Sequence, residues 1–298
     1  MFLKGDKVIY SFNPQMKEEY RVKSGDVFTV ETHDCFYQQF LKEDFGLEDL
    51  DMERVNPATG PIFVEGAEVG DILKVEILDI EVADRGVAAI LPGMGFLADT
   101  NTEETIEVIP VEDGYAKLLG FDIKVKPMIG VIGVAPKEGD IPTDTPGAHG
   151  GNLDTKDIMA GSTLYFPVAK EGALLALGDC HGLMGDGELG VTGLEIAAHV
   201  KLKVDVIKDK QLDWPLLETK EDVMLLVSDS DIQGALELGY GETRKLIERS
   251  IGCSWNEAGI LSSLAVDARI SQLVNPFITV RFPISKKILP VDRILEKL

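Results

Sequence analysis

Short runs rich in valine and isoleucine fill most of the first two-thirds of this chain, and they limit the folds open to it more than any other feature. Gly, Pro or Asp separates one run from the next. In the run 71–82, residues 73, 75, 77 and 79 alternate with residues 74, 76, 78 and 80, so one face is expected to be buried and the other mixed. Period-two alternation in β-branched sequence predicts strands. The clearest runs are 7–12, 26–32, 71–82, 123–136 and 172–179.

The pattern changes after about residue 210. Residues 223–229 predict a short buried strand, and 231–252 predict either one helix or two helices broken near Gly239–Gly241. Gly252 suits the left-handed position that comes after a helix end. Residues 277–284 predict a closing strand.

A second helix is expected to begin at Ser254, because Ser254 and Glu257 have the spacing of a capping box. We expect it to continue to Asn275, since the residue before Pro276 avoids the helical region.

These elements predict an α+β, β-rich fold with a β-sheet body over residues ~1–210, a helical C-terminal section and a closing strand. Residues 187–209 are expected to extend the body as a long strand or hairpin, and the charged segment 40–56 to leave the sheet as an excursion. A chain of 298 residues with no linker or repeat predicts a single domain, 1–298, with lobes 1–170 and 171–298 as a subdivision.

Charge and composition exclude several classes of protein. The formal net charge is −22, which repels phosphate backbones and anionic membrane surfaces, so no nucleic-acid or membrane partner is expected. No apolar run approaches the ~20 residues of a membrane span. The start of the chain has too short an apolar region for a signal peptide, so we expect a cytoplasmic protein. The three cysteines lack the spacing of a disulfide framework or a thiolate zinc site.

The segment 178–190 places several ligand-type side chains where a strand should end. Asp179 and His181 should share one face of that strand, and Cys180 should face the other way. A carboxylate beside an imidazole is half of a metal site, or else a structural hydrogen-bonded pair. Asp186 and Glu188 come next in a glycine-rich turn that brings two more carboxylates close by.

Two further segments repeat this combination. Residues 147–154 carry His149, Asn152 and Asp154 beside paired glycines, and the strand 26–32 leads into Asp34. His33 and Cys35 flank Asp34 but would face away from it in a regular strand. If the three segments converge, their oxygen and imidazole ligands suit Zn²⁺ or another divalent ion.

The motifs at 56–62 (NPATGPI), 149–154 (HGGNLD) and 177–188 (LGDCHGLMGDGE) resemble the acetamidase/formamidase family, as does the segment 263–276. The resemblance implies hydrolysis of short aliphatic amides to carboxylate and ammonia by a metal-dependent enzyme, with Zn²⁺ the first choice of ion and Ca²⁺ or another divalent ion the alternatives. It also implies a small amide substrate and a homodimer.

The resemblance further implies roles for individual residues. Asp34, Asp179 and His181 would hold the metal, with Asp154 as a further ligand. Glu188 would act as base and then acid, and His149 or nearby backbone N–H groups would stabilise the oxyanion. The residues expected to contact substrate or support the ligands are Asn152, Asp186 and Glu195. His33 and Cys35 do not match the pattern that the resemblance requires, so we treat both as incidental.

Three other hypotheses about the function remain open at this point. Cys180 or Cys35 could be the nucleophile of a cysteine hydrolase. The same scaffold could bind a metal or small molecule without catalysis. Ser262 or Ser263 could serve a serine amidase, although the apolar pattern around them favours helix packing.

Overall fold

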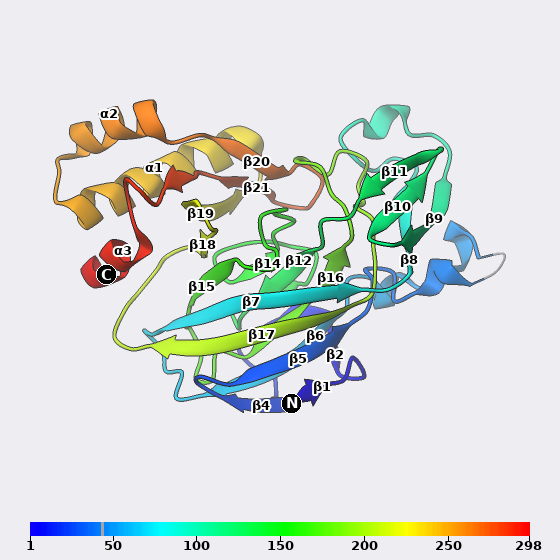
Figure 1. Ribbon diagram of the computed structural model, residues 1–298, viewed down its shortest axis with the longest axis horizontal. Helices are drawn as coiled ribbons and strands as arrows, with labels where there is room; N and C mark the ends of the chain where they lie inside the picture. The colour runs from blue at the N-terminus through cyan, green and yellow to red at the C-terminus, as the bar shows by residue number, and fades with distance from the viewer. Residues whose placement is uncertain (43–44) are drawn as a thin grey trace.

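The computed structural model describes residues 1–42 and 45–298. Its body is built from two packed β-sheets, and the predicted α+β, β-rich class is confirmed (Figure 1). The larger sheet is mainly antiparallel. Its order is β1 (Phe2–Leu3), β5 (Val27–Thr32), β17 (Ala198–Ile207), β7 (Ile72–Val82), β15 (Thr163–Pro167), β18 (Leu216–Glu218), β19 (Asp222–Asp229), β21 (Ile278–Arg281) and β20 (Arg269–Gln272), and β22 (Ile284–Ser285) pairs with β19.

The second sheet carries most of the candidate site. Its order is β14 (Gly150–Asn152), β12 (Met128–Gly133), β16 (Leu175–His181), β6 (Ala58–Glu65) and β2 (Val8–Ile9), with β4 (Tyr20–Lys23) parallel to β6. β16 therefore lies between two neighbours and is buried at every position, so its end delivers side chains into the interior. A two-stranded pair joins β13 (Ile141–Pro142) to β3 (Ser11–Phe12).

Between the two sheets lies the largest apolar cluster. β-Branched and aromatic side chains alternate along the strands, so each sheet contributes one apolar face to it. The fully or almost fully buried members include Phe28, Val30, Val200 and Leu202 from the larger sheet and Ile62, Ile129, Leu175 and Leu177 from the second.

The predicted alternation of buried and exposed residues does not continue along the whole of β7. Leu202 pairs with Ile77 and Lys201 pairs with Asp79, so Leu78 is an extra residue in the ladder. This bulge shifts the pattern by one position, because two residues of β7 face one residue of β17 there. Ile80 is buried and Asp79 is exposed, which corrects the expectation that Asp79 shares the buried face.

A four-stranded antiparallel sheet projects from the end of the body opposite the helices (Figure 1). It contains β11 (Phe121–Lys124), β10 (Tyr115–Leu118), β9 (Thr105–Glu112) and β8 (Arg85–Ile90). The predicted excursion 40–56 includes short 3-10 turns, and its residues 43–44 lie outside the described part of the chain. The 3-10 turns of this segment are Gln39–Leu41, Leu47–Asp49 and Met52–Arg54, and a further one, Ala98–Thr100, lies between β8 and β9.

The C-terminal section contains α1 (Ile232–Ile251), α2 (Trp255–Ala265) and α3 (Val291–Lys297). α1 is one continuous helix. Gly239 does not break it, because Gly239 is where α1 meets Phe282: an added Cβ would lie 2.3 Å from that ring. Asp231 caps the start of α1, and Gly252 ends it with φ +70°, as expected. None of the helices in the described residues has the length and apolar character needed to cross a membrane.

The predicted second helix begins correctly but ends early. Ser254 and Glu257 form the expected capping box, with Ser254 N donating to Glu257 Oε2 at 2.8 Å. The helix stops at Ala265, and residues 269–272 form strand β20 instead. Pairing of β20 with β21 provides tertiary hydrogen bonds that outweigh the local pattern. Likewise, only residues 198–207 of the expected strand or hairpin at 187–209 form a strand.

Candidate active site

The end of β16 places Asp179 and His181 together. His181 Nε2 lies 3.5 Å from Asp179 Oδ1, whereas Cys180 faces the core and accepts a hydrogen bond from Thr32 Oγ1 at 3.5 Å. The predicted arrangement of these three residues is therefore confirmed. Gly130 on β12 makes room for it, since an added Cβ would lie 2.5 Å from Asp154 Oδ1 and 2.6 Å from Asp179 Oδ2.

Carboxylates from separate segments surround the imidazole of His181. Its Nε2 lies 3.3 Å from Glu195 Oε2 and 3.7 Å from Asp154 Oδ1, and its Nδ1 lies 3.9 Å from Glu188 Oε1. Every one of these side chains is at least 94% buried, since none is more than 6% exposed. The loop after β16, the segment after β14 and the loop before β17 thus meet at one imidazole.

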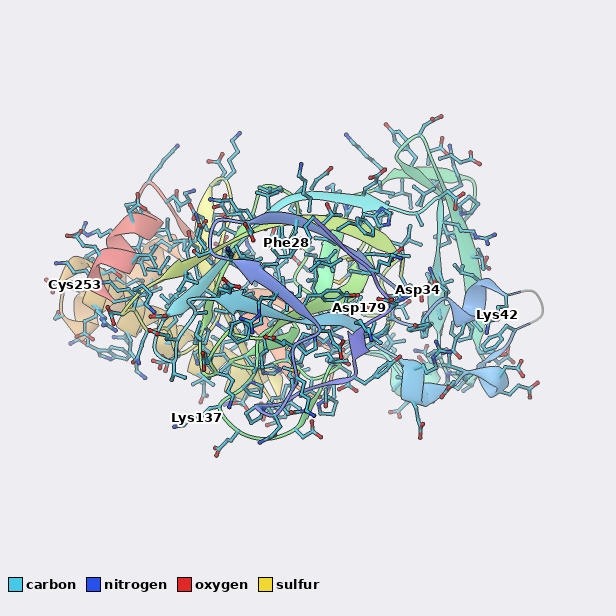
Figure 2. All side chains as sticks on the ribbon, turned by 90° about the horizontal axis from the view of Figure 1, so that it is seen from below. Phe28, Asp34, Lys42, Lys137, Asp179 and Cys253 are labelled. Carbon is cyan, nitrogen blue, oxygen red and sulfur yellow. The ribbon has the colours of Figure 1, made fainter. Side chains whose placement is uncertain are left out.

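Asp34 reaches the same region from the end of β5. Asp34 and Asp179 lie near one another in Figure 2. Burial raises the pKa of Asp34 to about 6, and the charge of Asp179 adds a smaller contribution. Asp34 Oδ1 accepts hydrogen bonds from the backbone N–H groups of Phe36 and Gln38, at 3.0 and 2.7 Å. These bonds fold residues 34–38 into a tight turn and leave Oδ2 as the oxygen available for a ligand.

Three of the site carboxylates lie on strained backbone. Asp154, Asp179 and Glu188 have φ values of +36°, +51° and +48°. Left-handed conformations are uncommon outside glycine, and such strain concentrates at functional sites, where the surrounding structure holds it in place. Left-handed residues also occur elsewhere, for example at Leu119 and Ala173, so this strain supports the site only together with the ligand cluster.

Burial strongly perturbs the titration of the cluster. Burial and the nearby charge of Glu195 raise the pKa of Asp179 to about 7. Burial and Asp179 raise the pKa of Asp154 to about 6, and burial together with Asp154 raises the pKa of Glu188 well above its usual range. Burial alone would lower the pKa of His181, but the carboxylates of Glu195 and Asp179 outweigh it and raise that pKa well above its ordinary value.

No Lys or Arg among the described residues forms an ion pair with Asp154, Asp179, Glu188 or Glu195. Several ligand atoms also lack any hydrogen-bond partner, namely Asp154 Oδ1, Asp179 Oδ1, Glu195 Oε2 and both ring nitrogens of His181. Buried charges are normally paired or bound to a metal. Separations of 3.3–3.7 Å around His181 Nε2 match the roughly 3.3 Å between ligand atoms that metal–ligand bonds of about 2.0–2.1 Å give in a tetrahedral zinc site.

Cys35 also belongs to this region, although in a regular strand its side chain would face away from Asp34. Ligand-type atoms of Cys35, Asp179 and Glu195 lie within 4.8 Å of one another, as do those of Asp154, His181 and Glu188. β5 ends at Thr32, so alternation no longer applies at Cys35. Burial, together with the charges of Glu195 and Asp179, raises the pKa of the Cys35 thiol well above its usual range.

His149 and Asn152 come shortly before Asp154 in the chain, and both are buried. His149 Nε2 and Asn152 Oδ1 have no hydrogen-bond partner. Burial lowers the pKa of His149 to about 4, so its imidazole is neutral near pH 7. The ring packs edge-on against Phe12 with centroids 5.2 Å apart. A neutral imidazole with a free ring nitrogen can donate or accept one hydrogen bond.

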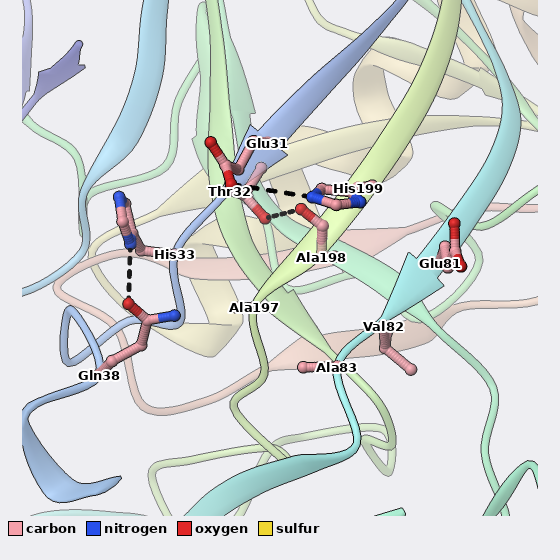
Figure 3. Close-up of a pocket in the computed structure, with 10 residues that line it drawn as sticks. All are labelled: Glu31, Thr32, His33, Gln38, Glu81, Val82, Ala83, Ala197, Ala198 and His199. Carbon is pink, nitrogen blue, oxygen red and sulfur yellow. Dashed lines mark hydrogen bonds and ion pairs between the residues drawn. The ribbon is translucent and has the colours of Figure 1, made fainter. Parts of the chain in front are cut away.

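His33 lines a cavity of about 330 Å³ at the ends of β5, β7 and β17 (Figure 3). Its two ring nitrogens lie 3.1 Å from Gln38 Oε1 and 2.8 Å from Gly5 O. Both nitrogens are therefore engaged by neutral groups, which agrees with treating His33 as incidental.

The serines of α2 have a packing role. Ser262 is buried and its hydroxyl donates to Ala258 O, one turn earlier in the helix, at 2.7 Å, while Ser263 is exposed. Cys253, the third cysteine, lies at the opposite end of the molecule from Asp34 (Figure 2).

Comparison with known proteins connects this arrangement to a family. A model of the Acetamidase/Formamidase family matches residues 4–143 and 138–224. The chain belongs to the acetamidase/formamidase family. It is thus an amidase, a hydrolase of carbon–nitrogen bonds.

Individual family members resemble the chain over most of its length. The formamidase of Methylophilus methylotrophus is 29% identical over 346 residues, covering 89% of this chain and 84% of that protein. The structure of a recombinant predicted acetamidase/formamidase from the thermophile Thermoanaerobacter tengcongensis matches with a TM-score of 0.95 and 45% identity, over 97% of both chains. The structure of an acetamidase from Bacillus halodurans matches with a TM-score of 0.94 and 41% identity, over 96% of this chain and 98% of that one.

Two polar residues near the cluster lie beyond the segment that the family model matches, and the sequence pattern predicted a role for neither. Asn275 Nδ2 donates to Asp154 Oδ2 at 2.6 Å and to Asn152 O at 3.1 Å. Arg281 is fully buried and binds Asp157 and Asp186. In the sequence, Asn275 resembled a helix terminator and Arg281 an ordinary strand residue, so no local signal distinguished them.

Proposed function

We propose that this amidase hydrolyses short aliphatic amides such as formamide and acetamide to carboxylate and ammonia, and that it depends on a divalent metal. The observation that carries the proposal is the group of buried carboxylates around His181, with unpartnered oxygens and no ion pair to Lys or Arg in the described residues. The acetamidases and formamidases among its relatives support the substrate class.

His181 Nε2, Asp179 and Asp154 would hold the ion, and Asp34 would contribute through Oδ2. Glu195, first expected to support the ligands, joins this set because its Oε2 is unpartnered and lies closest to His181 Nε2. Zn²⁺ fits the mixed oxygen and imidazole ligands best, with Ca²⁺ or another divalent ion as alternatives. When bound, such an ion polarises the amide carbonyl and lowers the pKa of a coordinated water towards ~7.

Glu188 moves the proton. Its raised pKa suits a group that accepts a proton from the attacking water and then donates it to the departing nitrogen. His149, neutral near pH 7, stabilises the developing oxyanion. The backbone N–H of Gly150 is not available for this role, because it donates to Gly147 O at 3.0 Å. Asn152 would contact the substrate amide, and its unpartnered Oδ1 supports this role.

A cysteine nucleophile fits the structure poorly. Cys180 lies in the apolar core, and burial raises its pKa to about 12. The pKa of Cys35 is also raised, which disfavours the thiolate form that a cysteine nucleophile needs. Retention of activity after iodoacetamide treatment, together with loss of activity on chelation, distinguishes the two mechanisms.

The direct test combines metal analysis with ammonia release from formamide, acetamide and propionamide. The proposal requires ammonia release that falls on removal of the metal and returns on addition of Zn²⁺. A metal-containing protein that releases no ammonia from any of the three amides would instead be a binding protein on this scaffold.

Residues 1–298 act as one catalytic domain in this proposal. The ligand set spans both lobes, from Asp34 to Glu195, and residues as late as Asn275 contact it. The homodimer implied by the family resemblance stays a prediction, which light scattering of the purified protein checks.

A further inference from the structure

Arg281 on β21 is a fully buried arginine that no proposed ligand set includes. Its Nε donates to Asp157 Oδ2 at 2.8 Å, its Nη2 to Asp186 Oδ1 at 2.7 Å and its Nη1 to Ile270 O at 2.5 Å. A buried guanidinium is costly unless its donors are paired, and the rigid fork fixes its partners relative to one another. Three separate segments are therefore joined at one side chain.

One of these segments leads directly to Glu188. Asp186 Oδ1 binds Arg281 and its Oδ2 lies 2.9 Å from Lys156 Nζ, so both oxygens are paired with cations. Asp186 is thereby occupied as a structural anchor and leaves the proton transfer to Glu188.

The residue between them is held by the same C-terminal segment. Gly187 N donates to Ser271 O at 2.8 Å, and Gly187 O accepts from Leu273 N at 3.0 Å. Glu188 itself has φ +48°, a conformation that persists only when surrounding contacts impose it. Two backbone bonds within the loop also hold Glu188, whose N donates to Gly185 O at 3.2 Å and whose O accepts from Val191 N at 2.9 Å. The contacts that tie this turn to the rest of the protein through Asp186 and Gly187 come from the segment 270–281.

We propose that Arg281 is a positioning residue for catalysis, which acts through Asp186 to hold Glu188 in its strained conformation beside His181. This inference rests on the proposed role of Glu188 as proton carrier. Arg281 contacts no reacting atom; its effect reaches the chemistry through the turn 185–188.

The second carboxylate partner of Arg281 provides a matched control. Asp157 binds the same guanidinium at nearly the same distance, and its side chain is 23% exposed compared with 35% for Asp186. No hydrogen bond links Asp157 to the turn that carries Glu188 in the described structure. If Arg281 had only a structural role, removal of either carboxylate partner would have similar effects on the protein.

The experiment compares Asp186→Ala, Asp186→Asn and Asp157→Ala with the parent protein and with Glu188→Gln, all loaded with Zn²⁺. We expect Asp186→Ala to lower kcat by roughly 10–100-fold, the usual effect of losing an outer supporting contact, with KM and metal content nearly unchanged. Asp186→Asn keeps an acceptor for Arg281 and should recover most of kcat. Asp157→Ala should retain kcat. Amide hydrogen exchange in the metal-free proteins should increase at residues 185–189 in Asp186→Ala alone.

The outcomes separate the inference from the proposed function. If Glu188→Gln loses kcat but Asp186→Ala does not, the positioning role of Arg281 is wrong and the role of Glu188 stands. Equal losses of kcat in Asp186→Ala and Asp157→Ala would also overturn it, as a general structural effect. If Glu188→Gln retains kcat, the proposed function of Glu188 is wrong and the positioning role is wrong with it.

Discussion

Asp179 should make the metal-free protein less stable as the pH rises, opposite to the usual behaviour of a carboxylate in a folded protein. Burial and Glu195 raise its pKa to about 7 in the folded state from 3.8. Between these values the folded state binds a proton that the unfolded state has lost. The stabilisation is therefore fully present below the unfolded pKa and is lost as the pH rises through the folded pKa.

The magnitude comes from the same pKa. Between about pH 5 and about pH 8 the unfolded carboxyl is ionised throughout, while the folded one loses its proton near pH 7. Integrated over this range, the difference in bound protons between the folded and unfolded states amounts to about two pH units. At 1.36 kcal/mol per unit, the free energy of unfolding falls by about 3 kcal/mol. A bound metal reverses the trend, because coordination requires the ionised carboxylate and competes with protons.

Comparing the parent protein with Asp179→Asn measures this contribution together with the change it causes in the titration of the neighbouring His181 and Asp154, whereas groups that do not interact with Asp179, such as His149, cancel. Asparagine has the same shape and tolerates the left-handed backbone at this position. Equilibrium urea unfolding at both pH values, without metal, should show the parent losing about 3 kcal/mol more than the variant. The exposed Asp84→Asn serves as the control and should lose as much as the parent. Equal losses in parent and Asp179→Asn would refute the assignment of Asp179 as a buried, uncompensated carboxyl.

Four other measurements test the site and the fold. Glu188→Gln should keep its metal, measured by mass spectrometry, while kcat falls by roughly 10²–10⁴-fold, the range for general acid–base catalysis. His181→Ala should lose metal and activity together, because it removes the nitrogen that the carboxylates surround. Activity should extend over amides of about one to three carbons and be absent on peptides, as kcat/KM across an acyl series would show. Gly239→Ala should lower the free energy of unfolding by about 1–3 kcal/mol, because its Cβ would meet Phe282 at 2.3 Å.

The sequence was most informative where local geometry decides the outcome. Alternation along a buried strand correctly placed Asp179 with His181 and turned Cys180 into the core. The capping box at Ser254 and the glycine after α1 are also local, and both formed as predicted. These features depend on a few neighbouring residues, so a single sequence contains the information they need.

Predictions failed where tertiary contacts replace local rules. Strand alternation turned the side chain of Cys35 away from Asp34 and the predicted site. The strand ends at Thr32, however, and the turn at Asp34 changes the direction of the chain, so Cys35 lies in the site. The expected helix through 269–272 gave way to pairing with β21. Arg281 and Asn275 have no local signature at all, because the carboxylates that they bind lie more than ninety residues away in the chain.

The same non-local contacts explain why this fold tolerates so unfavourable a centre. Asp154, Asp179 and Glu188 combine left-handed backbone with desolvated charge, and each of these two features alone opposes folding. The two-sheet core fixes Asp179, and the C-terminal segment fixes Asp154 through Asn275 and Glu188 through the turn bound by Arg281. A rigid frame of this kind keeps the carboxylates close together although they repel one another. A divalent ion bound as proposed would relieve that repulsion, so metal binding and global stability are expected to be strongly coupled in this protein.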